Sequence, residues 1–276
     1  MPSVLVTGAA RGIGKSIVEH LAERGWDVIA GVRSEEDAAA VTKHNPQRIS
    51  SVILDVTNAG HIDALRDSLP ERLDAIVNNA GIVVSGPMEA VGTDEWRRQL
   101  DINVIGQLAV TRAVLPRLRK SRGRIVFISS VNGKLSTPLI GAYCASKFAL
   151  EAAADALRME LRPWHIPVVV VQPAQTDTDM WRTADTMVEE TEAALTSGQR
   201  KLYAKHIAGM KKFIPLSQKM AVPAKKVSAV VAEALTARRP RARYVVGVGP
   251  KLQMALMTNV PTWARDQVLR RISGQP

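Results

Sequence analysis

The chain has 276 residues, of which 46% are hydrophobic and 23% charged, and its only cysteine is Cys144. This composition is typical of a soluble globular protein with a large core, and a lone cysteine excludes an internal disulfide. The five histidines lack the spacing of a zinc site, so we expect no metal. No apolar run reaches the roughly 20 residues that span a bilayer, and no basic leader precedes the first strand. We therefore expect a cytoplasmic protein.

The positive charge is concentrated in the last third of the chain. The net charge is +11, and residues 194–276 alone carry 16 Lys and Arg against two acidic residues, whereas residues 1–193 have a net charge of −3. Such a surplus indicates either a solvated basic face or an anionic partner such as a membrane surface. Nucleic acid is the least favoured partner, because the chain has no nucleic-acid-binding motif and few aromatic residues.

A strand, a glycine-rich turn and a helix open the chain. Residues 3–7 are an apolar strand, three glycines follow in residues 8–14, and an amphipathic helix comes next. Glycines permit a tight turn whose backbone N–H groups can approach a pyrophosphate at the start of the helix. This order predicts a dinucleotide site. Its expected contacts in the turn are Gly8, Arg11, Gly12, Ile13 and Gly14.

The end of the second strand, residues 26–32, indicates which dinucleotide binds. A carboxylate there would accept from the ribose of NAD, but this chain has Arg33, with Arg11 nearby in the turn. Two guanidiniums beside a 2′-phosphate make charge-assisted hydrogen bonds worth about 1.5 to 3 kcal/mol each. We therefore expect NADP(H). Glu35 and Glu36 follow closely, which leaves NAD(H) as the alternative.

Apolar strands alternate with helices along most of the chain. Further strands are expected at residues 49–54, 73–77, 124–128, 166–171 and 242–248, and the longest helices at 94–119 and 143–162. This alternation predicts an α/β fold with a doubly wound parallel sheet of the Rossmann type, covered by helices on both faces. Ligands of such sheets bind at the carboxyl ends of the strands. The expected contacts there are Asp55, Val56, Asn79, Ala80 and Gly81.

The chemistry is expected at Tyr143 and Lys147, which lie four residues apart in a helix and therefore on one face. A free tyrosine titrates near pH ~10, and a cation within a few ångströms lowers that pKa by roughly 1 to 3 units. Such a tyrosine could exchange a proton with an alcohol near neutral pH. Ser130 ends the fifth strand 13 residues before Tyr143, and Asn103 lies in the middle of the preceding long helix.

The residues in this order resemble the short-chain dehydrogenase/reductase family. The likeness is carried by the glycine turn with Thr7, by Asp55, Asn78 to Gly81, Asn103 and Ser130, and by Tyr143 with Lys147, and it covers roughly residues 3–250. It implies a single domain with about seven parallel strands. It also implies Tyr143 as the catalytic acid/base and Lys147 as the cation that lowers its pKa and holds the nicotinamide ribose.

The resemblance assigns the remaining site residues as well. It implies that Ser130 donates to the substrate oxygen and that Asn103 anchors a proton-relay water. Residues 173–178 match the family's segment after the sixth strand, so Thr176 and Thr178 are expected at the cofactor, with Thr178 at the carboxamide. Ala174 replaces the family's glycine there and would cost about 1 kcal/mol if the backbone required positive φ. Family members often form dimers or tetramers through the two long helices, which we expect here.

The substrate side is expected in residues 177–222, a long stretch that would form a lid. It is rich in methionine and aromatic residues, so we expect an apolar substrate in contact with Ser130, Tyr143, Met180 and Trp181. A weaker likeness points to steroid- and retinol-dehydrogenase-like members. The tail, residues 250–276, combines apolar and basic residues at helical spacing. It could pack on the core, contact a subunit or rest on a membrane surface.

The pattern as a whole predicts a single-domain enzyme over residues 1–276. It would transfer hydride between NADP(H) and an apolar ketone or secondary alcohol of steroid, retinol or lipid type. The alternative in the same class is an NAD-linked alcohol dehydrogenase. The alternatives from other classes are a non-catalytic dinucleotide sensor and a lipid-binding protein at the membrane surface. Neither of these needs the combination of Asn103, Ser130, Tyr143 and Lys147.

Overall fold

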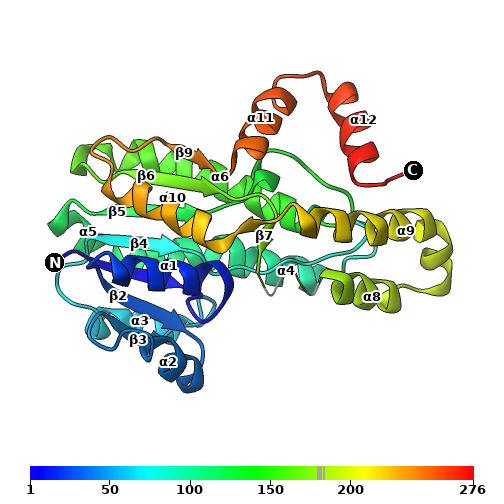
Figure 1. Cartoon of the computed structure of the whole chain (residues 1–276). Helices are drawn as coiled ribbons and strands as arrows, with labels where there is room; N and C mark the ends of the chain where they lie inside the picture. The colour runs from blue at the N-terminus through cyan, green and yellow to red at the C-terminus, as the bar shows by residue number, and fades with distance from the viewer. Residues whose placement is uncertain (179–181, 183) are drawn as a thin grey trace.

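A parallel sheet with helices on both faces forms the body of the protein in the computed structural model, which describes residues 1–178, 182 and 184–276 (Figure 1). The strands run in the order β3-β2-β1-β4-β5-β6-β9, and all of the pairs are parallel. The order reverses between β1 and β4, where open α/β sheets bind their ligands. The strands are β1 (Ser3–Thr7), β2 (Asp27–Val32), β3 (Ile49–Ile53), β4 (Ala75–Asn78), β5 (Arg124–Ile128), β6 (Val168–Gln172) and β9 (Arg243–Val245).

Both faces of the sheet are buried, which explains why the strands are apolar throughout. In β1, Val4 and Val6 belong to one core cluster and Leu5 to the other, as expected from the alternation of side chains along a strand. The helices α1 (Gly12–Glu23), α2 (Glu35–Thr42) and α10 (Ala224–Thr236) cover one face. The helices α3 (Ala59–Ser68), α5 (Gln107–Ser121) and α6 (Gly141–Glu160) cover the other. The predicted three-layer, doubly wound α/β fold is confirmed.

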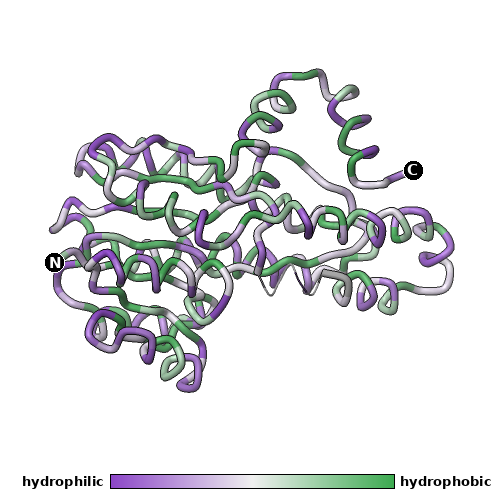
Figure 2. Tube along the Cα trace, viewed as in Figure 1, coloured by the Kyte–Doolittle hydropathy of each residue, from purple (hydrophilic) through white to green (hydrophobic). Residues whose placement is uncertain are grey.

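The seventh strand is shorter than expected. Residues 242–248 were expected to be extended, but β9 ends at Val245, and Gly247 has a φ of 96°. That left-handed backbone turns the chain directly into α11 (Val248–Met257), which is followed by α12 (Thr262–Ile272). Figure 2 shows that polar and apolar residues alternate along these last two helices.

The helix expected at residues 94–119 is divided into three consecutive parts. It begins as α4 (Thr93–Leu100), continues as a π-helical segment, η1 (Asp101–Gly106), and ends as α5. A π-helical segment inserts one residue into the hydrogen-bonding pattern and is frequent at functional sites. Asn103 lies inside it and is fully buried.

The stretch expected as a lid is a helical hairpin beyond the carboxyl ends of the strands (Figure 1). Its helices are α8 (Ala184–Ala194) and α9 (Ser197–Lys219). A two-residue ladder between β7 (Thr176–Asp177) and β8 (Val222–Pro223) joins the two ends of this insertion. The end of the tail packs on α9, because a Cβ on Gly209 would overlap the backbone of Gly274. Two short 3-10 turns, η2 (Val131–Gly133) and η3 (Arg162–Trp164), complete the described elements.

Candidate active site

The glycine turn has the shape of a phosphate-binding loop. Gly12 has a φ of 57°, a conformation that favours glycine, and it begins α1. A Cβ on Gly14 would lie 2.1 Å from the backbone oxygen of Gly8 and 2.5 Å from Nδ2 of Asn79. Only glycine therefore fits at this position. The turn keeps its backbone at the N-terminus of α1, where N–H groups bind anions, so these residues fit the pyrophosphate of a dinucleotide.

Asn79 braces this turn from the neighbouring strand. Its Nδ2 donates to the backbone oxygens of Thr7 (3.0 Å) and Gly8 (3.1 Å). The hydroxyl of Thr7 in turn accepts from the backbone N–H groups of Asn79 and Ala80, both at 3.0 Å. Asn79 was predicted as a cofactor contact, and the structure shows that its side chain holds the loop in shape. Thr7 was not among the predicted site residues, although its position directly before the glycines was the available signal.

Arg33 and Asp55 follow the carboxyl ends of β2 and β3, where the adenosine is expected, and Arg11 lies in the glycine turn. Both arginines are exposed, and neither forms an ion pair with another described residue. Burial raises the pKa of Asp55, but hydrogen bonds from Thr57 and the charges of Arg33 and His61 outweigh it and keep the pKa below its usual value. The carboxylate is therefore ionised beside Arg33, which forms no ion pair with a described residue.

The other predicted cofactor contacts are Val56, Ile13, Ala80 and Gly81, and the side chains of Val56 and Ile13 pack against the core. The side chain of Val56 packs in the core, so only its backbone lies at the edge of the sheet. Ile13 is half-buried against the opposite core cluster. Ala80 and Gly81 lie between the glycine turn and η1, and a Cβ on Gly81 would be 3.3 Å from Oδ1 of Asn103.

Asn103 fastens the chain after β4 to the π-helical segment. Its Oδ1 accepts from the N–H of Ile82 (2.8 Å), and its Nδ2 donates to the oxygen of the same residue (3.0 Å). Nδ2 also donates to Oγ of Ser146 at 3.1 Å, which links η1 to the helix that carries Tyr143. The side chain thus bonds the backbone of a neighbouring segment at the π-helical part of the helix.

Asn103 belongs to a buried stripe of polar residues that the sequence analysis missed. Gln99 bonds Val84 and Ile82 at 2.7 and 3.0 Å, and Gln107 donates to the oxygen of Ala80 at 2.6 Å. The signal was present in the sequence. Polar residues recur every fourth position of an otherwise amphipathic helix, at Gln99, Asn103, Gln107 and Thr111.

The structure brings Ser130 and Tyr143 together. Ser130 follows the end of β5, and its hydroxyl accepts from the backbone N–H of Asn132 at 3.1 Å. Burial raises the pKa of Tyr143 to about 12, although a side-chain hydrogen bond with Ser130 opposes that shift. The predicted lowering of this pKa is therefore wrong for the protein chain on its own, and the phenol is protonated at neutral pH.

The position of Lys147 explains this result. Its Nζ donates to the backbone oxygen of Ile128 at 2.8 Å and lies 5.8 Å from the centre of the Tyr143 ring. The ammonium is thus directed at the end of β5 rather than held against the phenol oxygen. Burial lowers the pKa of Lys147 to about 8, while Glu151 opposes that shift. The cation that was expected to act on Tyr143 is itself costly to keep charged.

The segment after β6 returns the chain to the glycine turn. Positive φ among the described non-glycine residues occurs at Arg122, Leu139 and His165, so Ala174 is not strained and the expected cost is absent. Thr178 lies against the turn, since a Cβ on Gly12 would be 3.4 Å from the Thr178 side chain. The hydroxyl of Thr176 donates to the oxygen of Ala174 (3.0 Å). The predicted substrate contacts Met180 and Trp181 lie outside the described residues.

The family model described as short chain dehydrogenase matches residues 2–189, which is more than half of the chain. The chain belongs to the short-chain dehydrogenase/reductase family. The resemblance proposed from the sequence and the expected oxidoreductase class are therefore confirmed. The glycine turn, Tyr143 and Lys147 all lie within the matched residues.

Similar proteins cover nearly the whole length of this short-chain dehydrogenase/reductase. The NADPH-dependent 3-dehydrocapnine reductase of Ornithobacterium rhinotracheale is 30% identical, and the alignment covers 97% of this chain and 96% of the relative. Retinol dehydrogenase 7 of Mus musculus is 31% identical, with 99% and 89% covered. The crystal structure of an actinorhodin polyketide ketoreductase with NADPH superposes with a TM-score of 0.74 at 26% identity, covering 90% and 95%.

Proposed function

We propose that this enzyme is an NADPH-dependent carbonyl reductase that converts apolar ketones to secondary alcohols. The observation that carries the proposal is the protonated phenol of Tyr143 beside Ser130, because burial raises its pKa to about 12. Reduction of a ketone needs a proton donor at the carbonyl oxygen, and a tyrosine in this state is one.

The roles of the side chains follow from their positions. The bound nicotinamide would supply the hydride. Ser130 would hold the carbonyl oxygen by a hydrogen bond, and Tyr143 would donate its proton to the same atom. The buried ammonium of Lys147, fixed at Ile128, would stabilise the phenolate that remains and contact the nicotinamide ribose. Asn103 would keep η1 in register with α6 through Ser146 and anchor a proton-relay water.

The preference for NADP(H) is supported by charge. Arg11 and Arg33 are exposed and form no ion pair with another described residue, so their guanidiniums are available to a 2′-phosphate. The bacterial relative is named as NADPH-dependent, and the ketoreductase structure was solved with NADPH.

The apolar character of the substrate is supported by the cluster under the helical hairpin. Leu139, from the loop that leads into α6, packs with Leu195, Ile207 and Met210 of the hairpin. The hairpin thus contacts the chain before α6 through aliphatic side chains. A name among the relatives, retinol dehydrogenase, points to substrates of this kind. We propose that residues 177–222 act as the substrate lid.

The test of catalysis is Tyr143→Phe, with Tyr244→Phe on β9, whose hydroxyl accepts from the N–H of Arg241, as the matched control. We expect Tyr143→Phe to reduce turnover of an apolar ketone by at least about 100-fold, as for loss of a general acid. NADPH binding, measured by fluorescence titration, should be retained, and the control should keep its turnover. Unchanged turnover in Tyr143→Phe would contradict the proposed role.

The same titration tests the cofactor preference. We expect NADPH to bind at least tenfold more tightly than NADH, a difference of about 1.4 kcal/mol. Arg33→Gln should remove most of that difference, whereas Arg239→Gln, an exposed arginine after α10, should leave it unchanged. Equal affinities in the wild type would favour the NAD-linked alcohol dehydrogenase instead.

A second proposal concerns the tail, which we infer rests on an anionic membrane surface. Leu252, Leu256 and Trp263 are 63%, 53% and 73% exposed, and the exposed Arg270 and Arg271 end α12. Apolar and basic residues combined in this way suit the boundary between lipid tails and anionic headgroups. Among the described residues, no helix is long and apolar enough to cross a bilayer.

Vesicle flotation tests this second proposal. The wild type should float with vesicles that contain anionic lipid and stay behind with neutral ones, and Trp263→Ala should bind less. Trp164→Ala removes an exposed tryptophan outside the tail and serves as the control. An absence of flotation in either lipid would remove the idea.

We also propose a homodimer or homotetramer that forms through α5 and α6. Exposed apolar side chains on α6 and on the segment before α5 support it, namely Ile105, Phe148 and Met159, which are 58%, 41% and 64% exposed. Sedimentation equilibrium of the wild type and of Phe148→Glu would measure the change in assembly, and a monomeric wild type would refute the proposal.

A further inference from the structure

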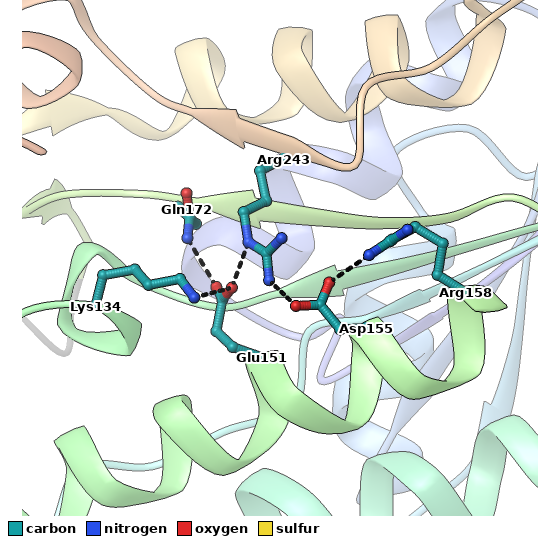
Figure 3. A network of polar contacts seen from close by, with 6 residues as sticks. All are labelled: Lys134, Glu151, Asp155, Arg158, Gln172 and Arg243. Carbon is teal, nitrogen blue, oxygen red and sulfur yellow. Dashed lines mark hydrogen bonds and ion pairs between the residues drawn. The ribbon is translucent and has the colours of Figure 1, made fainter. Parts of the chain in front are cut away.

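Glu151 is a buried carboxylate for which the proposed reduction has no role so far. It lies on α6 and is 2% exposed, and Figure 3 shows it at the centre of a polar network. Its Oε1 accepts from Nε2 of Gln172 on β6 (2.9 Å), and its Oε2 accepts from Nε of Arg243 on β9 (2.8 Å). The ammonium of Lys134 lies 3.8 Å from Oε2. Both carboxylate oxygens are therefore fixed in place.

The network continues along α6 but becomes exposed. Arg243 also donates to Oδ2 of Asp155 at 2.6 Å, and Arg158 donates to its Oδ1 at 2.9 Å. The Asp155 side chain is 35% exposed, so water screens the ion pairs at this end of the network. A surface pair of this kind contributes about 0 to 1 kcal/mol, and a buried ion pair is weak evidence for stability. A clamp between α6 and β9 therefore does not explain why a carboxylate is buried at position 151.

The position of Glu151 relative to Lys147 gives a reason. The two residues are four apart on α6, so they lie on one face of the helix, and both are buried. Lys147 reaches Ile128 at the end of β5, while Glu151 lies beside Gly133 in η2. A Cβ on Gly133 would be 2.8 Å from Oγ of Ser129 and 3.2 Å from Oε1 of Glu151. Both side chains thus flank the strand end that carries Ser130.

We propose that Glu151 is a positioning residue for Lys147, whose buried carboxylate, fixed by Gln172 and Arg243, keeps the Lys147 ammonium protonated at the end of β5. A buried ammonium without a counter-charge releases its proton readily. An unprotonated Lys147 would neither stabilise the Tyr143 phenolate nor hold its hydrogen bond to Ile128 as a charged donor. The inference deepens the proposed function and rests on the role given there to Lys147.

Several elements contribute ionisable groups around Lys147 and Glu151. Burial lowers the pKa of Lys147 to about 8, and Glu151 is the charge that opposes this shift. On α6 itself the neighbouring ionisable groups are Tyr143 and Cys144, and burial raises the pKa of both, so both are neutral at pH 7. The loop after η2 contributes Lys134, and β9 contributes Arg243, both at Glu151, while β6 contributes the neutral Gln172.

The elements on the other side of α6 add no unpaired charge near Lys147. In α4, the acidic and basic residues pair with each other at the surface. In η1, Asp101 is exposed, and the buried Asn103 is neutral. Within the described residues, Glu151 is therefore the buried negative charge that can act on Lys147.

Glu151→Gln in the full chain tests the proposal, because it removes the charge and keeps the shape. The first readout is the titration of the Lys147 Cε resonance in cofactor-free protein labelled with ¹³C-lysine, assigned with Lys147→Arg. We expect the midpoint to fall by about one pH unit or more. The second readout is kcat/KM for ketone reduction by NADPH, whose decline at alkaline pH should move to lower pH by the same amount.

Asp155→Asn is the matched control, since it removes the same charge from the same network one turn further along α6. The titration midpoint of Lys147 in this variant should stay within about 0.3 pH unit of the wild-type value, because Asp155 is partly exposed and solvent screens its charge. An unchanged midpoint in Glu151→Gln, or an equal shift in both variants, would overturn the proposal and leave Glu151 as a structural clamp.

A second variant, for which the Lys147 midpoint should change in the opposite direction, tests the proposal if Glu151→Gln does not fold. Arg243→Gln keeps the carboxylate and removes its neutralising cation, so the Lys147 midpoint should rise. A midpoint that stays or falls would contradict the proposal. The titration needs no turnover. A protein with the expected shifts that reduces no ketone would therefore refute the proposed function while leaving the role of Glu151 intact.

Discussion

Asn103→Leu is the substitution that most directly tests how the site is assembled. The side chain is fully buried in η1 and makes hydrogen bonds to both backbone groups of Ile82 and to Ser146. Leucine has a similar size and no polar atoms. The substitution therefore removes these hydrogen bonds with little change in volume.

The expected loss of stability follows from which partners remain satisfied. The oxygen of Ile82 keeps a hydrogen bond from Gln99 (3.0 Å), and Ser146 keeps its bond to the oxygen of Tyr143 (2.7 Å). The N–H of Ile82 loses the acceptor that the structure shows for it. An unpaired buried N–H costs about 1 to 3 kcal/mol, and each other lost bond about 0.5 to 1.5 kcal/mol. Because Ile82 is half-buried, we expect a net loss of about 2 to 4 kcal/mol.

Urea unfolding followed by tryptophan fluorescence measures this loss, and the chain has five tryptophans as probes. The matched control is Asn259→Leu, the same substitution at an exposed residue whose Nδ2 donates to Ala255 (2.7 Å). The control should change the free energy of unfolding by less than about 0.5 kcal/mol. If both variants lose the same free energy of unfolding, the bonds from Asn103 to Ile82 do not hold the segment after β4.

Three further predictions concern the cofactor loop and Lys147. Gly14→Ala should abolish detectable NADPH binding in a fluorescence titration, because its Cβ would lie 2.1 Å from a backbone oxygen, whereas Gly198→Ala, with no atom within 4 Å of its Cβ, should bind normally. Ala174→Gly should leave turnover unchanged and lower stability by about 0.4 to 1 kcal/mol through the unfolded chain, and a gain in turnover would show that alanine is strained there. For Lys147, the folded pKa of about 8 lies below the usual 10.5, so the unfolded chain binds the proton more tightly between these values. The stability of the wild type relative to Lys147→Met should therefore rise from pH 8 to pH 10.5, and a flat difference would show that the lysine titrates normally.

The sequence by itself determined the sheet and the phosphate loop. Apolar runs alternating with helices require a parallel sheet that is covered on both faces, and β1 and β5 have the bounds expected of them. Gly14 is required by a contact within seven residues of chain, and such local steric constraints are readable from residue order. The pairing of Tyr143 with Lys147 is likewise local, since both lie on one helix.

The tertiary structure alone decided the protonation states and the supports of the site. The pKa of Tyr143 depends on burial, which is a sum over residues distant in sequence, and it is raised although a cation lies four residues away. Glu151 bonds Gln172 and Arg243 because β6 and β9 lie beside α6, so the spacing of these residues along the chain does not predict the two hydrogen bonds. The order of residues determines the conformation of neighbours in the chain. Burial, and the electrostatic interactions between residues distant in sequence, arise only when the helices pack on the sheet.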